Sequence, residues 1–366
     1  MPDSTTITAD EFCRFAISVF QCAGLPAEQA QQAVAPLVWA SLRGVDTHGI
    51  RNFKPYYVDG LIAGRIASTA ACEIEYETPL SARANGADGL GLSAAGWGMR
   101  LAIDKAETSG IGLISMRNSN HLGAAGYFSQ LAVEQDMIGL CLSGHLYGEG
   151  NATGMPPVFG LQPMFGTNPL SVAIPCGDEP TYVLDMSTSV VPVNRVEMMQ
   201  EQGQSIPLGW CLDAAGRPTS DPGQAAIFLP LGGTRELGAH KGFGLAMLVE
   251  VLTALLSNGW APATDSTPAD APGVYHQERI AHFFGAIRID LFRAAGEFRQ
   301  AMDAMIGSLH RAQPAPGHER IFVPGEIEHD TQRIRSRQGI PLSHKEVQDL
   351  RWLSKRYDLP LTFSHS

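Results

Sequence analysis

Basic residues are scarce in this chain. Lysine and arginine number 26 against 37 aspartates and glutamates, which gives a formal net charge of −11. No basic run interrupts this balance, so the sequence argues against a nucleic-acid partner. An anionic small molecule would have to be bound by a few local cations, and the candidates are Arg51, Arg117, His121 and Lys241.

Signals for export and for membrane insertion are also lacking. The first residues, MPDSTTITADEF, have neither a basic start nor an apolar stretch, and no apolar segment is long enough to span a bilayer. The six cysteines are scattered without a CxxC spacing. We therefore expect reduced, buried thiols in a cytoplasmic protein that has no membrane partner.

Several cofactor and catalytic motifs are absent. GADGLGLSAAG is neither a GxGxxG fingerprint nor a Walker loop, and HKGFGLAM lacks a third glycine at the required offset. The histidines show no HExxH or i, i+4 pairing, and no GxSxG elbow occurs. The sequence therefore predicts no metal site and no Rossmann fingerprint, and it disfavours metal-assisted and serine hydrolysis.

The residues that are present predict an α/β fold with helical ends. TITADEFCRFAISVFQCAGL predicts a capped helix, a second helix runs from about Pro26, and strands alternate with helices from about residue 60. KGFGLAMLVEVLTALLSNG predicts the most apolar helix, which we expect protein to cover on most sides. Helices return after about residue 295, with VPGEIEHD as a loop, so we expect the two chain ends to pack together.

Two histidines stand out by their positions. His48, in ASLRGVDTHGIRNF, follows the second helix, and Asp46 is close enough in sequence to orient its ring. His121, in RNSNHLGAAGYF, lies between a predicted strand and a predicted helix. Loops at strand ends collect catalytic groups, and a histidine there can act as a general acid or base. Each histidine taken alone is more often a capping or hydrogen-bonded turn residue.

Polar turns supply further candidates. Thr167 and Asn168 precede a proline, Asp185 ends a strand before the polar stretch 187–189, and Lys241 opens a helix whose free N–H groups favour an anion. Such turns can line a nucleotide site with hydroxyl and amide groups. They can equally be ordinary turns.

Taken together, these stretches resemble one family, the non-Rossmann malate/L-lactate dehydrogenases, whose relatives include sulfolactate, ureidoglycolate and diketogulonate oxidoreductases and cyclic-imine reductases. The similarity runs in one order along nearly the whole chain, through RGVDTHGIRNFKPYYVDGLIAG, NSNHLGAAGYFSQLA, FGTNPLSVAIP, LDMSTSVV, AHKGFGLAMLVEVLTALLSNG, VPGEIE and RIRSRQGIPL. It implies an intertwined homodimer that uses NAD or NADP. It also implies a non-Rossmann NAD(P)-binding α/β domain over residues 76–295, capped by helical parts at 1–75 and 296–366, which accounts for the missing glycine fingerprint.

The resemblance also implies roles for individual residues. His48 matches a histidine that is the proton donor in some relatives, and His121 matches the acid/base of others. The residues that it places at the substrate are Thr47, Arg51, Asn52 and Thr167. The residues that it places at the cofactor are Asn168, Asp185, Ser187, Thr188, Ser189, His240, Lys241, Gly242, Pro324, Gly325 and Glu326.

This chain departs from the family pattern in three places. Thr47 replaces the usual serine before the first histidine, which keeps a hydroxyl there. Asn52 replaces the usual arginine, with Arg51 one position earlier, and asparagine cannot supply a two-pronged contact to a substrate carboxylate. The stretch SGHLYGEGNATGMPPVFG is unusual, and its His145 is either a substrate-pocket residue or a loop residue without a role.

The reaction that follows is reversible hydride transfer between nicotinamide and the hydroxyl-bearing carbon of a small 2-hydroxy acid. One of the two histidines exchanges the hydroxyl proton while the other orients the substrate. Three alternatives stay open: NADPH-dependent reduction of a cyclic imino acid, a catalytically silent nucleotide-binding protein, and a metal-dependent lyase. The choice between NAD and NADP is also open, since Arg195 alone is weak support for a 2′-phosphate contact.

Overall fold

A seven-stranded sheet forms the centre of the molecule. The computed structural model describes residues 5–146, 154–258 and 279–365. The strand order is β2-β3-β4-β11-β5-β6-β7, and β3 and β4 are parallel while the other neighbours are antiparallel. The bounds of these strands are Glu73–Glu77 (β2), Ser81–Asn85 (β3), Ile111–Ser119 (β4), Met137–Leu146 (β5), Leu170–Ile174 (β6), Tyr182–Met186 (β7) and Arg279–Arg288 (β11).

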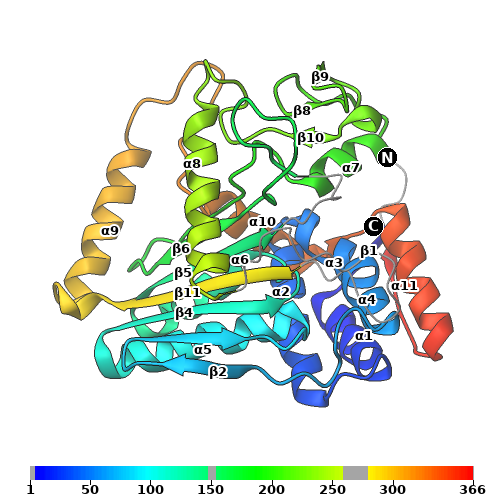
Figure 1. Ribbon diagram of the computed structural model, residues 1–366, viewed down its shortest axis with the longest axis horizontal. Coiled ribbons are helices and arrows are strands. Elements are labelled where there is room, and N and C mark those ends of the chain that lie inside the picture. Colours follow the sequence, from blue (N-terminus) through cyan, green and yellow to red (C-terminus); the bar gives the residue numbers. More distant parts are fainter. Residues whose placement is uncertain (1–4, 147–153, 259–278, 366) are drawn as a thin grey trace.

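Helices cover both faces of this sheet (Figure 1). Helices α5 (Gly91–Ser109) and α6 (Ala125–Leu131) bury one face, in a core that includes Met116, Phe128 and Phe284. On the other face lies α8 (Ala239–Glu250), which continues into a π-helical turn at Val251–Leu255. The hydroxyl of Ser115, in β4, donates to the Leu252 and Thr253 carbonyls of that turn at 3.0 Å. The mixed α/β architecture expected from the sequence is therefore confirmed.

The two ends of the chain meet in a second, small sheet. Strand β1 (Thr5–Ile7) pairs with both β12 (Ile340–Pro341) and β13 (Ser364–His365). Helix α1 (Ala9–Cys22) starts as predicted, because the Thr8 hydroxyl accepts from the Glu11 amide at 3.2 Å. The apolar sides of α1, α2 (Ala27–Leu42) and α11 (His344–Tyr357) share one core, with Phe12 and Leu353 fully buried in it.

A compact bend leads from α2 into the short helices that carry the first histidine. It comprises a 3-10 turn (Asp46–His48), α3 (Ile50–Asn52), a π-helical turn (Phe53–Val58) and α4 (Asp59–Ile62). The Ser41 hydroxyl accepts from the Ile50 amide at 3.0 Å, and a Cβ at Gly49 would lie 2.2 Å from the Ser41 Oγ. A glycine is therefore required where this bend folds back on α2.

The remaining elements lie outside the central sheet. They are α7 (Val193–Glu201), a small sheet of β8 (Cys211–Leu212), β9 (Pro218–Thr219) and β10 (Ile227–Phe228), α9 (Ala295–His310) and α10 (Glu326–Gln338). Short 3-10 turns occur at Val133–Gln135, Pro222–Gln224 and Ile289–Leu291. Helix α9 packs through Met302 and Ile306 on the side of β6 and β7. No helix among the described residues is long and apolar enough to cross a bilayer.

One sequence expectation about local structure is not met within the single chain, and another is wrong. Helix α8 and its continuation are not covered on most sides by their own chain, because about half of each side chain at Met247, Leu248, Leu255 and Leu256 is exposed. The stretch VPGEIEHD is not a loop throughout, because α10 begins at Glu326. Gly325, at φ 96°, makes the turn before the helix, and the Glu326 carboxylate accepts from the Val323 amide at 2.8 Å.

Candidate active site

The two candidate histidines lie against each other. His48 comes from the bend after α2 and His121 from the turn after β4, yet their ring centroids are 5.5 Å apart and the rings are inclined by only 22°. Segments that are distant in the sequence thus bring two imidazoles to one place. Two positive rings at this spacing would repel, so the pair favours at most one bound proton near neutral pH.

The ring of His121 is oriented by Tyr57. The tyrosine hydroxyl lies 2.7 Å from Nδ1, and the Gly123 amide lies 3.3 Å from the same nitrogen. An amide N–H can only donate, so Nδ1 accepts and the neutral ring carries its proton on Nε2. Burial raises the pKa of Tyr57 well above its ordinary value, which keeps the hydroxyl protonated as a donor.

The ring of His48 is held by its neighbour in the chain. Its Nδ1 lies 2.8 Å from Thr47 Oγ1, and burial lowers its pKa to about 4. His48 is therefore neutral at pH 7 and able to accept a proton. The Asp46 carboxylate does not orient this ring as expected, because Arg335 binds it at 2.5 and 2.9 Å.

Asn52 fixes the backbone of the bend that carries His48. Its amide donates to the Thr47 carbonyl at 3.0 Å, and the Asn194 amide, from α7, donates to the same carbonyl at 2.6 Å. Asn194 also donates to Asn52 Oδ1 at 3.0 Å, and Tyr56 donates to Asn194 Oδ1 at 3.3 Å. Asn52 is thus part of a network that positions the bend.

Arg51 also connects this bend to α7. Its side chain is 6% exposed, and its guanidinium binds both carboxylate oxygens of Glu201 at 2.8 and 2.9 Å and Glu197 at 3.3 Å. These acidic partners raise the pKa of the arginine despite its burial. The charge that would grip a substrate carboxylate is therefore already neutralised within the chain.

The predicted substrate residue Thr167 and the predicted cofactor residues Asn168 and 187–189 form one connected group. The Thr188 amide donates to the Thr167 carbonyl at 2.9 Å, and the hydroxyls of Ser187, Thr188 and Ser189 all donate to backbone carbonyls. Asn168, at φ 38°, donates to the Ala246 carbonyl of α8 at 3.0 Å. Within the described part of the chain its Oδ1 has no hydrogen-bond partner.

The start of α8 lies beside that group. The Leu231 amide donates to the Thr188 carbonyl at 2.8 Å, and a Cβ at Gly242 would come within 2.3 Å of the Leu231 carbonyl oxygen. Only glycine lets α8 approach this closely. His240 Nδ1 lies 2.9 Å from an Arg235 nitrogen, while Lys241 is exposed.

These segments fit a phosphate-bearing cofactor. Lys241 and Arg195 each stand in the first turn of a helix, where the backbone N–H groups and the helix dipole favour an anion. Across the ranges 5–146, 154–258 and 279–365, no acidic side chain pairs with either cation. The buried Oδ1 of Asn168, which has no hydrogen-bond partner among the described residues, is a further polar atom that can accept a hydrogen bond from a ligand.

Asp185 joins the predicted cofactor segments to the His121 turn. It lies in β7, and its Oδ2 accepts from the Gly126 amide, at the start of α6, at 2.8 Å. The side chain of Asp185 reaches solvent, but many protein atoms surround its carboxyl group. The resulting desolvation raises the pKa of Asp185 to about 6. A carboxyl group that titrates close to neutral pH beside His121's turn is typical of a functional site.

The segment Pro324–Glu326 packs on the opposite end of β7. The Pro324 carbonyl accepts from the Val183 amide at 3.2 Å, and the Gly325 carbonyl accepts from Arg43 at 3.1 Å. Glu326 is turned toward the end of α9, where its Oε1 lies 2.8 Å from His310 Nε2. Both of its carboxylate oxygens are thus bonded within the chain, one to His310 and one to the Val323 amide.

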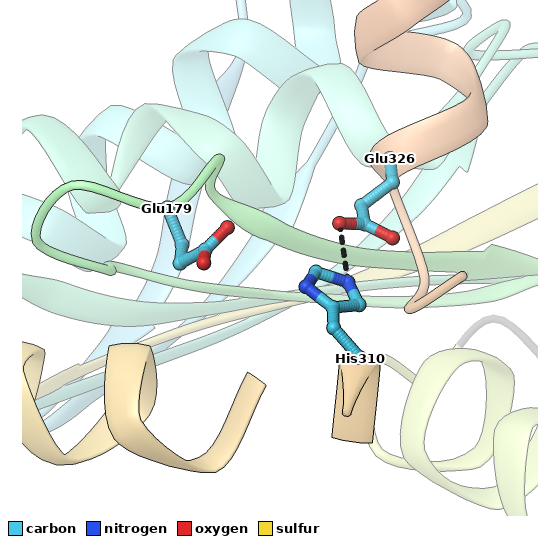
Figure 2. A group of neighbouring side chains, drawn as sticks. All are labelled: Glu179, His310 and Glu326. Atoms are coloured by element: carbon cyan, nitrogen blue, oxygen red, sulfur yellow. Dashed lines mark ion pairs between the residues drawn. The ribbon is translucent and has the colours of Figure 1, made fainter. Parts of the chain in front are cut away.

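Glu326 also belongs to the one group of described side chains whose geometry suits a metal ion. Figure 2 shows Glu326 and His310 facing each other, with the Glu179 carboxylate directed toward them. Their ligand atoms lie within 4.8 Å of one another. The three residues come from separate segments, so no spacing motif in the sequence signals this group. The contact that the structure shows in this group is the ion pair between His310 and Glu326, which joins α9 to α10.

Three residues near the histidines were not predicted from the sequence, namely Tyr56, Tyr57 and Asn194. The two tyrosines stand in KPYYVDG, within the stretch that carries the family resemblance, and this was the available signal. Asn194 carried no signal, because its role depends on α7 packing against the His48 bend. The side chain of His145 and residues 147–153 lie outside the described residues.

Comparisons with known proteins show the family of this chain. The family model for malate/L-lactate dehydrogenase matches residues 7–351. The chain belongs to the malate/L-lactate dehydrogenase family. The resemblance inferred from the motifs is thereby confirmed, and this family member is an oxidoreductase that acts on the CH–OH group of a hydroxy acid.

Individual relatives of this malate/L-lactate dehydrogenase family member cover nearly its whole length. It is 35% identical over 355 residues to the malate dehydrogenase of Pyrococcus abyssi, which spans 96% of this chain and 94% of that one. It is 28% identical over 322 residues to a protein of Escherichia coli O157:H7 named ureidoglycolate dehydrogenase (NAD(+)), which covers 87% of each chain. The crystal structure of malate dehydrogenase from Entamoeba histolytica superposes with a TM-score of 0.91 at 32% identity, over 98% of this chain and 100% of that one.

Proposed function

We propose that this enzyme transfers hydride reversibly between the nicotinamide of NAD or NADP and the hydroxyl-bearing carbon of a small, anionic 2-hydroxy acid. The observation that carries the proposal is the stacking of the His48 and His121 rings at 5.5 Å. Malate and ureidoglycolate, which appear in the names of two relatives, are both 2-hydroxy acids. This common chemistry supports the substrate class without selecting a member of it.

The two histidines take different parts in the proton transfer. His48, whose pKa is lowered to about 4, is the neutral base that accepts the hydroxyl proton during oxidation. Thr47 Oγ1 accepts its Nδ1 proton, which leaves Nε2 as the basic nitrogen. His121 donates from Nε2 to the same substrate oxygen and so orients it. The nicotinamide, when bound, supplies the hydride acceptor.

The dinucleotide is held by the segments around the start of α8. Lys241 and Arg195 meet its phosphates from two helix starts, and Asn168, Asp185 and the 187–189 turn line the same region. The mainly antiparallel strand order supports a non-Rossmann mode of binding, because the Rossmann mode uses parallel strands. The remaining candidate contacts at this site are His240, Gly242 and Pro324–Glu326.

Arg51 and Asn52 act on the substrate through the His48 bend. Arg51 is bound to Glu197 and Glu201, and the Asn52 amide is bound to the Thr47 carbonyl. We assign the substrate's carboxylate to other donors, with Thr47 and Thr167 as the remaining candidates in the predicted set. The loss of the family's arginine then alters which 2-hydroxy acid is preferred rather than abolishing turnover.

A homodimer accounts for the exposed apolar side of α8. Met247, Leu248, Leu255 and Leu256 on α8 and its continuation are about half exposed, and so are Met305 and Leu309 on α9. Exposed apolar side chains gathered on a helix in this way are typical of an interface between subunits. Leu248→Glu should shift the mass measured by light scattering toward a monomer, while Tyr76→Glu, at an exposed position on β2, should not.

A cytoplasmic location accords with the thiols. All six cysteines are free, and burial raises the pKa of Cys141 well above its ordinary value, so this thiol is unreactive. Free thiols persist in reducing compartments. Maleimide labelling of the native protein should reach the exposed Cys22 and leave Cys141 unmodified.

Binding and turnover measurements separate this function from its alternatives. Fluorescence titration with NAD and with NADP comes first, followed by a panel of 2-hydroxy acids, 2-oxo acids and cyclic imines with and without a chelator. We expect turnover of a 2-hydroxy acid that does not depend on metal. Turnover of imines alone favours the imine reductase, dinucleotide binding without any turnover favours the silent protein, and chelator-sensitive activity without nicotinamide favours the lyase.

A further inference from the structure

A third histidine, which is buried, contacts the turn that carries His121. His282 is in the middle of β11 and is fully buried. Its Nε2 lies 2.8 Å from Ser119 Oγ and 3.2 Å from the Asn120 carbonyl, and its Nδ1 lies 3.1 Å from Ser143 Oγ. One imidazole thus joins three neighbouring strands at the point where β4 ends.

A bulge in β4 creates this arrangement. His282 pairs with Met116 and Ile280 pairs with Ser119, so two residues of β4 stand opposite one residue of β11 between these pairs. In a regular strand, positions 116 and 119 would point to opposite faces of the sheet. The extra residue, with Asn118 at φ 51°, brings Ser119 onto the face of His282.

The partners of His282 determine where its proton is. A carbonyl oxygen can only accept, so the contact with Asn120 requires a proton on Nε2. Nδ1 then accepts from the Ser143 hydroxyl. The ring is satisfied as a neutral imidazole, because each nitrogen has a partner of the matching kind.

The Asn120 carbonyl is the last backbone group before His121. The side-chain amide of Asn120 also holds this residue in place, because it donates to the carbonyls of Asp88 and Gly89 at 3.3 and 2.9 Å. The first residue of α5 packs against it from another direction, because a Cβ at Gly91 would lie 2.1 Å from the Asn120 oxygen. The position of His121 relative to His48 therefore depends on this peptide.

We propose that His282 is a positioning residue of the hydride-transfer site: by holding the Asn120 carbonyl and the Ser119 hydroxyl, it fixes the turn that places His121 against His48. The inference rests on the proposed function for its effect on turnover. The Nε2 side of His282 carries this role. Among the described residues, the Nδ1 side hydrogen-bonds to Ser143 alone, on the strand β5 that does not carry His121.

Two isosteric substitutions separate the two sides of the ring. In His282→Gln the side-chain nitrogen reaches the place of Nε2 and can still donate to Asn120, whereas in His282→Asn the shorter amide reaches only the place of Nδ1. Displacement of a catalytic group by an ångström costs about 100-fold, so we expect His282→Asn to lower kcat/KM by about 10- to 100-fold. His282→Gln should stay within about fivefold of the wild type, and the dinucleotide Kd should change less than about threefold in both.

Ser143→Ala is the matched control, because it removes the Nδ1 partner without touching Ser119 or Asn120. It should leave kcat/KM within about threefold of the wild type. The pH profile of kcat/KM should be unchanged in His282→Gln, because His282 does not exchange protons with the substrate. Equal losses in the two His282 variants, a loss in Ser143→Ala as large as in His282→Asn, or lowered Tm with unchanged kcat would overturn the proposal.

A measurement without substrate distinguishes this proposal from the proposed function. Hydrogen exchange of the peptide 118–126 should be faster in His282→Asn than in His282→Gln, because only the former releases the Asn120 carbonyl. If this difference is found while the wild type turns over no 2-hydroxy acid, the proposed function is wrong, whereas the structural part of the proposal, that His282 fixes the turn of His121, stands. If the wild type is active and the exchange is the same in both variants, the positioning role is wrong.

Discussion

Gly91→Ala tests whether the position of the Asn120–His121 peptide controls catalysis. Gly91 is the first residue of α5, and a Cβ there would lie 2.1 Å from the Asn120 oxygen and 2.5 Å from the His121 oxygen. The backbone of Gly91 does not have the positive φ that favours glycine. The substitution therefore acts through the close contact and not through backbone strain.

The size of the effect follows from these distances. Real Cβ atoms essentially never lie closer than 3.0 Å to such an atom, so the peptide must shift by roughly 1 Å relative to α5. Overpacking of this kind destabilises a protein by about 1–3 kcal/mol. An ångström of displacement in a catalytic group costs about 100-fold in rate, so kcat/KM should fall by about two orders of magnitude while most of the protein remains folded.

Gly96→Ala in the same helix is the matched control. A Cβ at Gly96 would meet only the flexible end of Arg100 at 3.3 Å, and alanine is the better helix former by about 1 kcal/mol. Initial rates at 340 nm and thermal unfolding of both variants provide the comparison. The reasoning is refuted if Gly91→Ala unfolds at a lower temperature but keeps wild-type kcat/KM, or if both variants lose activity equally.

Three further predictions concern single groups. Tyr57→Phe removes the hydroxyl group that contacts His121 Nδ1, and it should lower kcat/KM about tenfold without changing the affinity for the dinucleotide. An unchanged kcat/KM would show that the Gly123 amide alone orients the ring. Arg51→Met should lower the free energy of unfolding, measured in urea, by about 1–3 kcal/mol, because it breaks the ion pair with Glu201. The KM for the hydroxy acid should stay within about threefold of the wild type. A rise in KM without a loss of stability would instead make Arg51 a substrate contact. Burial lowers the pKa of His282 to about 3, below its ordinary value of 6.5, so the unfolded chain gains a proton there that the folded protein does not. Stability should therefore fall as pH drops below about 6.5, by up to about 1.4 kcal/mol per pH unit from this group, and the fall should be shallower in His282→Gln.

Local patterns predicted the elements that depend on local contacts. The cap of α1 follows from Thr8 and Glu11, three residues apart, and the strands β4 and β5 follow from short apolar runs beside glycine. The start of α10 could also have been predicted. Acidic residues are enriched in the first turn of a helix, and Glu326 and Glu328 supply this signal within VPGEIEHD.

Contacts between distant segments could not be predicted from spacing. The pairing of Asp46 with Arg335 and the packing of Asn194 on the Thr47 carbonyl depend on the tertiary structure. The exposure of α8 could not be predicted either, because an apolar helix shows that its surface needs a partner and does not show which molecule provides it. That His48 and His121 lie together could be predicted only through the family resemblance.

The paired action of the two imidazoles is the central claim, and a double-mutant cycle tests it most directly. kcat/KM with a 2-hydroxy acid is measured for the wild type, His48→Gln, His121→Gln and the double variant. Each single substitution should lower kcat/KM by about 10²- to 10⁴-fold. The kcat/KM of the double variant should be no more than about tenfold below that of the less active single variant, because the rings act as a unit. Wild-type turnover in either single variant, or losses that multiply in full, would contradict the account.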